Sequence, residues 1–122
     1  MSTRSAVIVK VGKKYKGIYC HWDGDSLLPA LQTHSKTQKT AEALVALGSC
    51  SQICNTVRQK PIGPHTFDKP EEGTVLAYHR DRNEPWENCY PLEGSTWREV
   101  ANEIDVHYIY VFNGKVWKLN KV

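Results

Sequence analysis

The chain opens with an apolar, β-branched run, which a short glycine turn separates from a second run rich in apolar residues. Residues 6–11 are AVIVKV and residues 15–22 are YKGIYCHW, with Gly12-Lys13-Lys14 between them. Alternate residues of a strand share a face. The apolar residues that share a face are Val7, Val9 and Val11 in the first run, and Ile18, Cys20 and Trp22 in the second. This pattern predicts an N-terminal hairpin of two strands.

Two later segments space their apolar residues as one face of a helix. In residues 40–47 these are Ala41, Leu44, Val45 and Leu47. Gly48 follows them, where a left-handed C-cap is expected. Residues 96–104 begin with a capping box formed by Thr96 and Glu99. The apolar positions of this second helix are Trp97, Val100, Ala101 and Ile104.

Weaker patterns predict shorter elements. Residues 26–34 are expected to form a short helix, with Ser26 as N-cap and Pro29 in the first turn, where proline is tolerated. Residues 49–57 are expected to add one more helical turn, and residues 74–79 (TVLAYH) to form a third strand. We expect a long ordered loop over residues 60–73 and a second irregular stretch over residues 80–91.

The strongest local signal lies near the C-terminus, where residues 108–112 (YIYVF) and 115–119 (KVWKL) flank Asn113-Gly114. This dipeptide favours a two-residue type I′ turn. The turn sets a register with these pairs: Phe112 with Lys115, Tyr110 with Trp117 and Tyr108 with Leu119 on one face, and Val111 with Val116 and Ile109 with Lys118 on the other. One face is expected to pack on helices, and the other to meet a loop, a second protomer or a ligand.

Together these elements predict a single α+β domain over residues 1–122, with a mainly antiparallel five-stranded sheet and two or three helices. A chain of 122 residues and 13.9 kDa is too short for a multidomain enzyme. With 16 basic and 13 acidic residues the formal charge is +3, which favours an anionic partner only weakly and makes nonspecific DNA binding the least expected function.

The chain has no apolar run of the length that a membrane span needs, and its polar start lacks the apolar region of a secretory signal. We therefore expect a soluble protein of the cytoplasm that does not bind membranes. The cysteines, Cys20, Cys50, Cys54 and Cys89, are then expected to be reduced. Their spacing does not favour a zinc site, and no metal or cofactor is expected.

No group of residues favours catalysis. His79-Arg80-Asp81 matches the start of a kinase catalytic loop only by coincidence, because the chain lacks the other kinase motifs. Cys20 and His21 are neighbours on a predicted strand, so their side chains would point to opposite faces. No pair of carboxylates has the spacing for acid/base hydrolysis, so we expect a binding protein rather than an enzyme.

The candidate ligand site lies within residues 78–90, where Arg80 and Arg82 are close to Trp86 and Tyr90. Arginine grips phosphate through paired donors while an aromatic ring such as Tyr78 or Trp86 stacks on a base. The alternative is a solvated charged loop with Trp86 beneath it.

Trp22 and Asp23, at a strand end, form either a binding corner or a core residue followed by a turn. Several other residues are candidates to extend the ligand surface: Arg4, Arg58, Trp97 and Lys115.

Several blocks of the chain together resemble a family of small phage and prophage proteins. They are residues 2–5 (STRS), 18–24 (IYCHWDG), 47–48 (LG), 77–82 (AYHRDR) and 108–112 (YIYVF), with Trp117. The blocks run in the family's order from one end of the chain to the other. The family usually has Asp-Gly-Tyr-Pro, then a glycine and a Leu-x-x-His-Tyr helix. This chain instead has Asp23-Gly24-Asp25-Ser26, and its predicted helix ends at His34-Ser35.

The resemblance implies a phage setting, and small phage proteins of this kind are similar to anti-defence sponges such as those against Thoeris. We therefore expect a homo-oligomeric protein of the host cytoplasm that sequesters a cyclic ADP-ribose isomer or another small cyclic nucleotide. Arg80, Arg82 and Arg58 would hold phosphates, and Trp22, Trp86 or Tyr78 would stack on the base.

The alternative is an inhibitor that docks on a host protein through Tyr108, Tyr110 and Trp117. A third class, an enzyme that cleaves nucleotides, predicts that the ligand is turned over.

Overall fold

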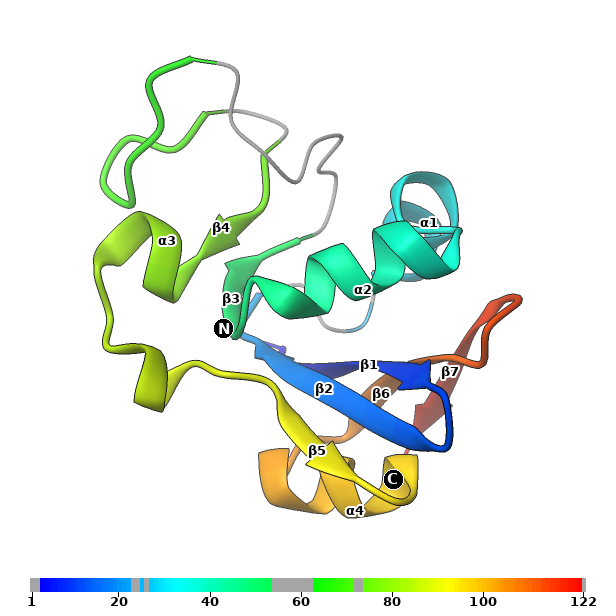
Figure 1. Ribbon diagram of the computed structural model, residues 1–122. Helices are drawn as coiled ribbons and strands as arrows, with labels where there is room; N and C mark the ends of the chain where they lie inside the picture. The colour runs from blue at the N-terminus through cyan, green and yellow to red at the C-terminus, as the bar shows by residue number, and fades with distance from the viewer. Residues whose placement is uncertain (1–2, 23–24, 26, 54–62, 72–73, 122) are drawn as a thin grey trace.

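The computed structural model describes residues 3–22, 25, 27–53, 63–71 and 74–121 (Figure 1). Its strands are β1 (Ser5–Val11), β2 (Lys14–Cys20), β3 (Cys50–Gln52), β4 (Leu76–Ala77), β5 (Leu92–Gly94), β6 (Tyr108–Phe112) and β7 (Trp117–Lys121). Its helices are α1 (Leu28–His34), α2 (Gln38–Ala46), α3 (Tyr78–Arg82) and α4 (Trp97–Ile104), with a 3₁₀ turn, η1, at Trp86–Asn88. The predicted α+β class is confirmed, but the described residues form four α-helices where two or three were predicted, because the short α3 lies in a segment expected to be strand and loop.

The strands form one mixed sheet, so the prediction of a mainly antiparallel five-stranded sheet was wrong. The order is β4-β3-β2-β1-β6-β7, and β5 pairs with β2 outside this path. Strand β1 is antiparallel to β2 but parallel to β6, and β2 is parallel to β3. Parallel pairs have no connecting turn to signal them, and the three-residue strands β3 and β5 are too short to show alternation.

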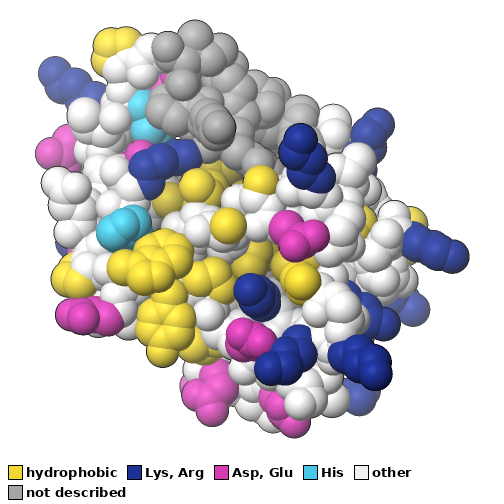
Figure 2. Space-filling view, viewed as in Figure 1, with side chains coloured by type: hydrophobic (Ala, Val, Ile, Leu, Met, Phe, Trp, Pro, Cys, Tyr) yellow, Lys and Arg dark blue, Asp and Glu magenta, His cyan; other side chains and the backbone are white. Residues whose placement is uncertain are grey.

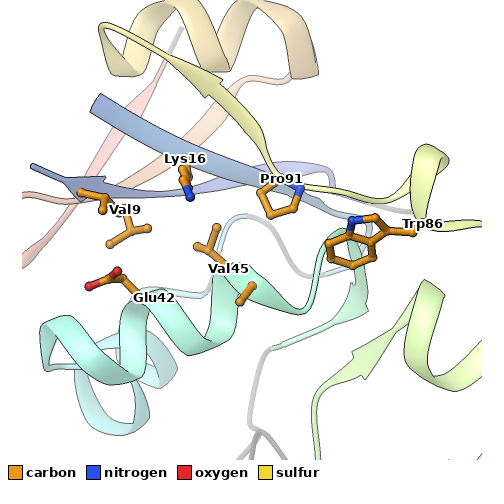
Figure 3. A pocket seen from close by; sticks show the side chains of 8 residues that line it. Val9, Lys16, Glu42, Val45, Trp86 and Pro91 are labelled. Atoms are coloured by element: carbon orange, nitrogen blue, oxygen red, sulfur yellow. The ribbon is translucent and has the colours of Figure 1, made fainter. Parts of the chain in front are cut away.

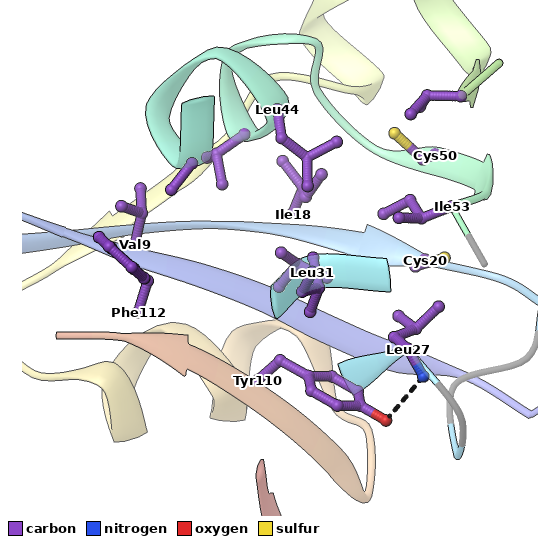
Figure 4. Packing of buried hydrophobic residues seen from close by; sticks show 14 of the residues in the cluster. Val9, Ile18, Cys20, Leu27, Leu31, Leu44, Cys50, Ile53, Tyr110 and Phe112 are labelled. Atoms are coloured by element: carbon purple, nitrogen blue, oxygen red, sulfur yellow. Dashed lines mark hydrogen bonds between the residues drawn. The ribbon is translucent and has the colours of Figure 1, made fainter. Parts of the chain in front are cut away.

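Helices cover both faces of this sheet (Figure 1). One core lies between the sheet and the pair α1 and α2, and includes Val7, Val9, Ile18, Cys20, Tyr110 and Phe112. A second core lies under α4 and includes Ala6, Ile8, Ile109 and Val111. In the first core the Leu27 N–H donates to the Tyr110 hydroxyl oxygen at 3.2 Å (Figure 4). Strands β1 and β6 are thus buried on both faces, as parallel strands usually are.

The N-terminal hairpin and the two clear helices are confirmed. Helix α2 begins two residues earlier than predicted because Thr37 caps it, accepting the Thr40 N–H at 3.2 Å. Gly48 follows α2 with a φ of +83°, as expected of a left-handed C-cap. At α4, Thr96 accepts the Glu99 N–H at 3.2 Å, but the Glu99 carboxylate accepts the N–H of Ser95 instead of completing the box.

Three of the weaker predictions needed correction. Residues 50–52 form strand β3 rather than a helical turn, and residues 54–62 lie outside the described residues. The strand predicted over 74–79 is reduced to β4, because the chain turns into α3 at Tyr78. Helix α1 begins at Leu28 without a side-chain cap, and Ser26 lies outside the described residues. The described part of the predicted long loop, residues 63–71, contains no helix or strand.

The C-terminal hairpin forms, but its register differs by two residues from the prediction. Phe112 pairs with Trp117 and Tyr110 with Leu119, which leaves residues 113–116 as a four-residue loop. The Asn113 Oδ1 accepts the N–H groups of residues 115 and 116 at 2.9 and 3.0 Å, so the side chain closes the loop in place of a type I′ turn. A shift of two keeps each residue on its predicted face. Both faces of β6 lie in the helix-covered cores, however, so neither is left for a protomer or ligand.

Candidate functional site

Two of the three arginines predicted to hold phosphates, Arg80 and Arg82, lie on helix α3, which directs them apart. Residues two apart on a helix are separated by about 200° of rotation. Arg80 donates from Nε to Asp81 Oδ1 at 2.9 Å and from Nη2 to Asp81 Oδ2 at 3.1 Å and to the Val75 carbonyl. The Arg82 side chain is 55% exposed, and its Nε lies 3.7 Å from Glu84 Oε2. Arg80 therefore stabilises the fold through its bonds to Asp81 and Val75, whereas the Arg82 side chain is exposed at the surface.

Asp81 is the centre of a buried polar network. Its side chain is only 3% exposed, and it accepts the Ala77 N–H at 2.8 Å in addition to the bonds from Arg80. The ring of His65 places Nε2 3.0 Å from Asp81 Oδ2, while Nδ1 accepts the Glu71 N–H at 2.9 Å. Burial raises the pKa of Asp81, but the hydrogen bonds from Arg80 and Ala77 and the approach of His65 outweigh it, so the pKa lies below its ordinary value. The network ties residues 63–71 to α3.

An open cleft beside this network brings Arg82 together with two tyrosines. Its volume is about 420 Å³, and its lining is Tyr19, Ser49, Tyr78, Arg82, Glu84, Asn88 and Cys89. We call it the tyrosine cleft. Ser49 sets the spacing of its walls, because its hydroxyl accepts the Tyr19 N–H at 3.4 Å and its carbonyl accepts the Tyr78 N–H at 3.2 Å. The volume is within the range of small-molecule sites.

Phe67 packs against Tyr78 and Arg82, the two residues that α3 contributes to the tyrosine cleft. The rings of Phe67 and Tyr78 stack with centroids 5.7 Å apart, and the Arg82 guanidinium carbon lies 5.1 Å from the Phe67 centroid. Burial raises the pKa of the Tyr78 phenol, although a hydrogen bond with Ser51 opposes the shift. Tyr78 is therefore a neutral hydrogen-bond donor at physiological pH.

The β2 wall carries a chain of aromatic rings. The Tyr19 hydroxyl lies 2.6 Å from Nδ1 of His21, and the His21 ring meets Trp22 edge-on with centroids 4.9 Å apart. Burial raises the pKa of Tyr19, although Arg4 lowers it in part. Trp22 is 42% exposed, so its interpretation as a core residue was wrong. Beyond Tyr19 the surface continues into a second hollow of about 220 Å³, which shares Tyr19, Ser49 and Asn88 with the tyrosine cleft.

Trp86 lies in a different groove, between α2 and the β1–β2 hairpin (Figure 3). This groove has a volume of about 330 Å³ and is lined by Val9, Val11, Lys16, Glu42, Val45, Ala46, Trp86 and Pro91. The Trp86 indole is 42% exposed and meets His79 edge-on, with centroids 5.0 Å apart. Trp86 is therefore neither beneath a loop nor part of the tyrosine cleft lining.

Of the predicted site residues, the structure thus brings together Tyr78 and Arg82. Arg80 is used in the buried network, and Asp23 and Arg58 lie outside the described residues. Sequence reasoning missed Tyr19, Ser49 and Asn88. Tyr19 had a signal, because it lies on the face of its strand opposite the apolar residues Ile18 and Cys20.

The surface suggested for docking on a host protein is mostly buried. Tyr110 is fully buried, and Trp117 is 4% exposed and donates from Nε1 to the Ser35 carbonyl at 2.8 Å. Tyr108 is half-buried, and the Lys121 ammonium lies 5.5 Å from its ring centroid. These rings stabilise the fold rather than present a docking face.

Cysteine and metal chemistry have little support in the described residues. Cys50 and Cys89 carry free, buried thiols, and burial is the main cause that raises the pKa of each. Cys20 is buried beside Cys50, while Cys54 lies outside the described residues. Within the ranges that the structure covers, no three His, Cys, Asp or Glu side chains are grouped to hold a metal.

None of the helices described is long and apolar enough to cross a membrane.

Comparison of the chain with protein-family models, with curated proteins and with solved structures finds no significant match.

Proposed function

We propose that this chain is a phage-encoded anti-defence protein that sequesters a small nucleotide signal in the tyrosine cleft, without catalysis. The observation that supports the proposal is the placement of Arg82 beside the rings of Tyr19 and Tyr78. A guanidinium binds phosphate oxygens through paired N–H donors, and an aromatic ring stacks on a base. A nucleotide such as a cyclic ADP-ribose isomer carries both features.

In this mode Arg82 contacts a phosphate, and the Tyr78 phenol donates a hydrogen bond to another ligand oxygen. Both phenols have raised pKa values and so keep their protons at physiological pH. Glu84 is the opposing feature, because its carboxylate lies 3.7 Å from Arg82 Nε and competes with an anionic ligand. The ligand must displace this weak surface pair, which costs little because exposed ion pairs contribute only about 0.2–1 kcal/mol.

The hydrogen-bond contacts of two histidines near the tyrosine cleft, His65 and His21, support binding without turnover. His65 is 1% exposed, and its two ring nitrogens lie at 2.9 Å from the Glu71 N–H nitrogen and 3.0 Å from Asp81. His21 directs Nδ1 at the Tyr19 hydroxyl. Neither arrangement presents a general base to the tyrosine cleft. We also propose that the protein forms a homo-oligomer and acts in the host cytoplasm.

Calorimetry with cyclic ADP-ribose isomers and cyclic oligonucleotides tests the proposal. Arg82→Gln should weaken binding of the recognised ligand by about 10-fold or more, since hydrogen bonds to charged groups contribute about 1.5–3 kcal/mol. Arg98→Gln is the matched control. Arg98 is exposed on α4, with its guanidinium carbon 4.8 Å from the Trp97 centroid, and this change should leave affinity unaltered.

Three further measurements separate the alternatives. Chromatography of the ligand after denaturing the complex should recover it unchanged, and light scattering should give the mass of an oligomer. Failure of the whole nucleotide panel to bind, or turnover of the ligand, contradicts the proposal. So does recovery of a stoichiometric host protein in a pull-down together with failure to bind nucleotides.

A further inference from the structure

Two loops and the start of helix α2 meet at one end of the sheet (Figure 1). The β1–β2 turn follows Val11, and because β6 is parallel to β1, the β6–β7 loop emerges beside it. Helix α2 begins at the same end. Gln38, its first residue, donates from Nε2 to the Lys10 carbonyl at 2.8 Å, and its Oε1 lies 3.8 Å from where a Cβ on Gly114 would be.

Exposed lysines come from the end of β1, the β1–β2 turn, the start of α2 and the β6–β7 loop. The group consists of Lys10, Lys13, Lys14, Lys36, Lys39 and Lys115, and we call it the lysine end. In Figure 2, Lys and Arg side chains lie along the right-hand edge of the molecule, where Figure 1 places the two loops and the start of α2. Two carboxylates lie at this end: Glu93 is 3.3 Å from the Lys14 ammonium, and Glu42, on α2, accepts from Gln38 Nε2 at 2.9 Å.

The positive charge of the chain is concentrated in the lysine end. Six lysines and two carboxylates give 6 − 2 = +4, whereas the remaining 10 basic and 11 acidic residues of the chain give −1. Helix α2 has no acidic residue in its first turn, so the positive end of its dipole adds to the same field. A formal charge of +3 therefore understates the potential at this end.

We propose that the lysine end binds the phosphate backbone of a nucleic acid, without reading its sequence. Lysine is a compact point charge on a flexible stem, suited to phosphate contacts that position a protein without specifying bases. Protein interfaces instead deplete lysine and centre on aromatic residues and arginine. Of the large hydrophobic residues that the structure describes as exposed, only Val116 belongs to these loops, which is too little to insert into a membrane.

Fluorescence anisotropy with a short labelled DNA duplex tests this proposal over a range of salt concentrations. Four phosphate contacts predict a slope of log affinity on log salt of about −3.6, which is a loss of about 100-fold between roughly 50 and 200 mM salt. The double variant Lys36→Gln with Lys115→Gln should reduce the slope by about 1.8. The matched control, Lys69→Gln with Lys121→Gln, removes two exposed lysines outside the lysine end and should leave the slope unchanged.

The proposal is overturned if the duplex does not bind at low salt, or if both double variants change the slope equally. It is also overturned if vesicles containing phosphatidylserine or a polyglutamate peptide bind while the duplex does not. None of these substitutions touches the tyrosine cleft, so the nucleotide titrations described above succeed or fail independently.

Discussion

Replacing Asp81 with asparagine tests whether its buried network stabilises the fold. The substitution keeps the shape of the side chain but removes its charge and converts one acceptor into a donor. Both carboxylate oxygens face donors: Oδ1 accepts from Arg80 Nε at 2.9 Å, and Oδ2 accepts from the Ala77 N–H at 2.8 Å and lies 3.0 Å from His65 Nε2. Either orientation of the new amide therefore places a donor against a donor.

The expected loss of stability can be worked from these contacts. Removing one partner of a buried ion pair costs about 3–5 kcal/mol, and one hydrogen bond to a charged group contributes about 1.5–3 kcal/mol. The Arg80 side chain is 25% exposed, so water compensates part of the loss. We therefore expect Asp81→Asn to lower the free energy of unfolding by about 2–3 kcal/mol. At about 3–5 °C per kcal/mol for a domain of this size, Tm falls by about 6–15 °C.

Thermal unfolding of the unmodified protein and of the Asp81→Asn variant, over a range of pH, measures the difference in stability between them. Because the folded pKa of Asp81 lies below the unfolded value of about 3.9, its contribution is present above that pH and is lost as pH falls through the folded pKa. The difference should persist from about pH 7 to about pH 5 and narrow only below about pH 4.

Asp68→Asn, at an exposed position of the loop 63–71 that the network ties to α3, is the control and should change stability by less than about 0.5 kcal/mol. An Asp81 variant as stable as this control, or a difference that closes between about pH 7 and 5, would refute the reasoning.

Three further predictions concern single residues. Glu84→Gln should raise the affinity of the tyrosine cleft for an anionic ligand by about 2- to 5-fold, because a competing carboxylate is lost, and unchanged affinity in calorimetry contradicts this. Gly48→Ala should destabilise by more than about 2 kcal/mol in urea titrations, since its φ is +83° and a Cβ would lie 2.5 Å from a backbone oxygen. Gly12→Ala, with a φ of +62° and open space, should cost only about 1 kcal/mol, and equal costs would disprove the steric argument. The buried Cys50 thiol has a pKa well above its ordinary value, so in a Cys54→Ser background it should react with Ellman's reagent only after denaturation, as peptide mass spectrometry would show.

The elements that the sequence predicted well are those whose signal is local. Helices α2 and α4 each bury one periodic stripe and begin at a capping threonine, and the N-terminal hairpin joins two strand-forming runs through a short glycine turn. The parallel pairing of β1 with β6 could not be predicted, because it joins segments about a hundred residues apart with no turn between them. At Asn113 the signal was ambiguous. The same side chain that favours a type I′ turn can also accept two N–H groups and close a longer loop, as it does here.

The candidate site was predicted in part because its residues were close in sequence, and the errors arose from the secondary structure between them. The sequence pattern predicted an irregular stretch that included residues 80–82, and it therefore placed Arg80 and Arg82 in one site. Helix α3, only five residues long, separates Arg80 from Arg82 but keeps Arg82 on the same side as Tyr78, four residues before it. Ser49 accepts the Tyr19 N–H through its hydroxyl and the Tyr78 N–H through its carbonyl, but it comes from another part of the chain and could be found only from the fold.

The arrangement of charge gives the two proposed binding surfaces different physical behaviour. Arg82 is the cationic side chain in the tyrosine cleft lining, so binding there depends on ring stacking and hydrogen bonds in addition to one charge contact. The lysine end has six exposed cations and no aromatic ring among them. Raising the salt concentration should therefore weaken nucleotide binding only slightly, while duplex binding should fall steeply. Equal salt dependence of the two would mean that both ligands bind through the same diffuse charge, and the assignment of a nucleotide to the tyrosine cleft would then be wrong.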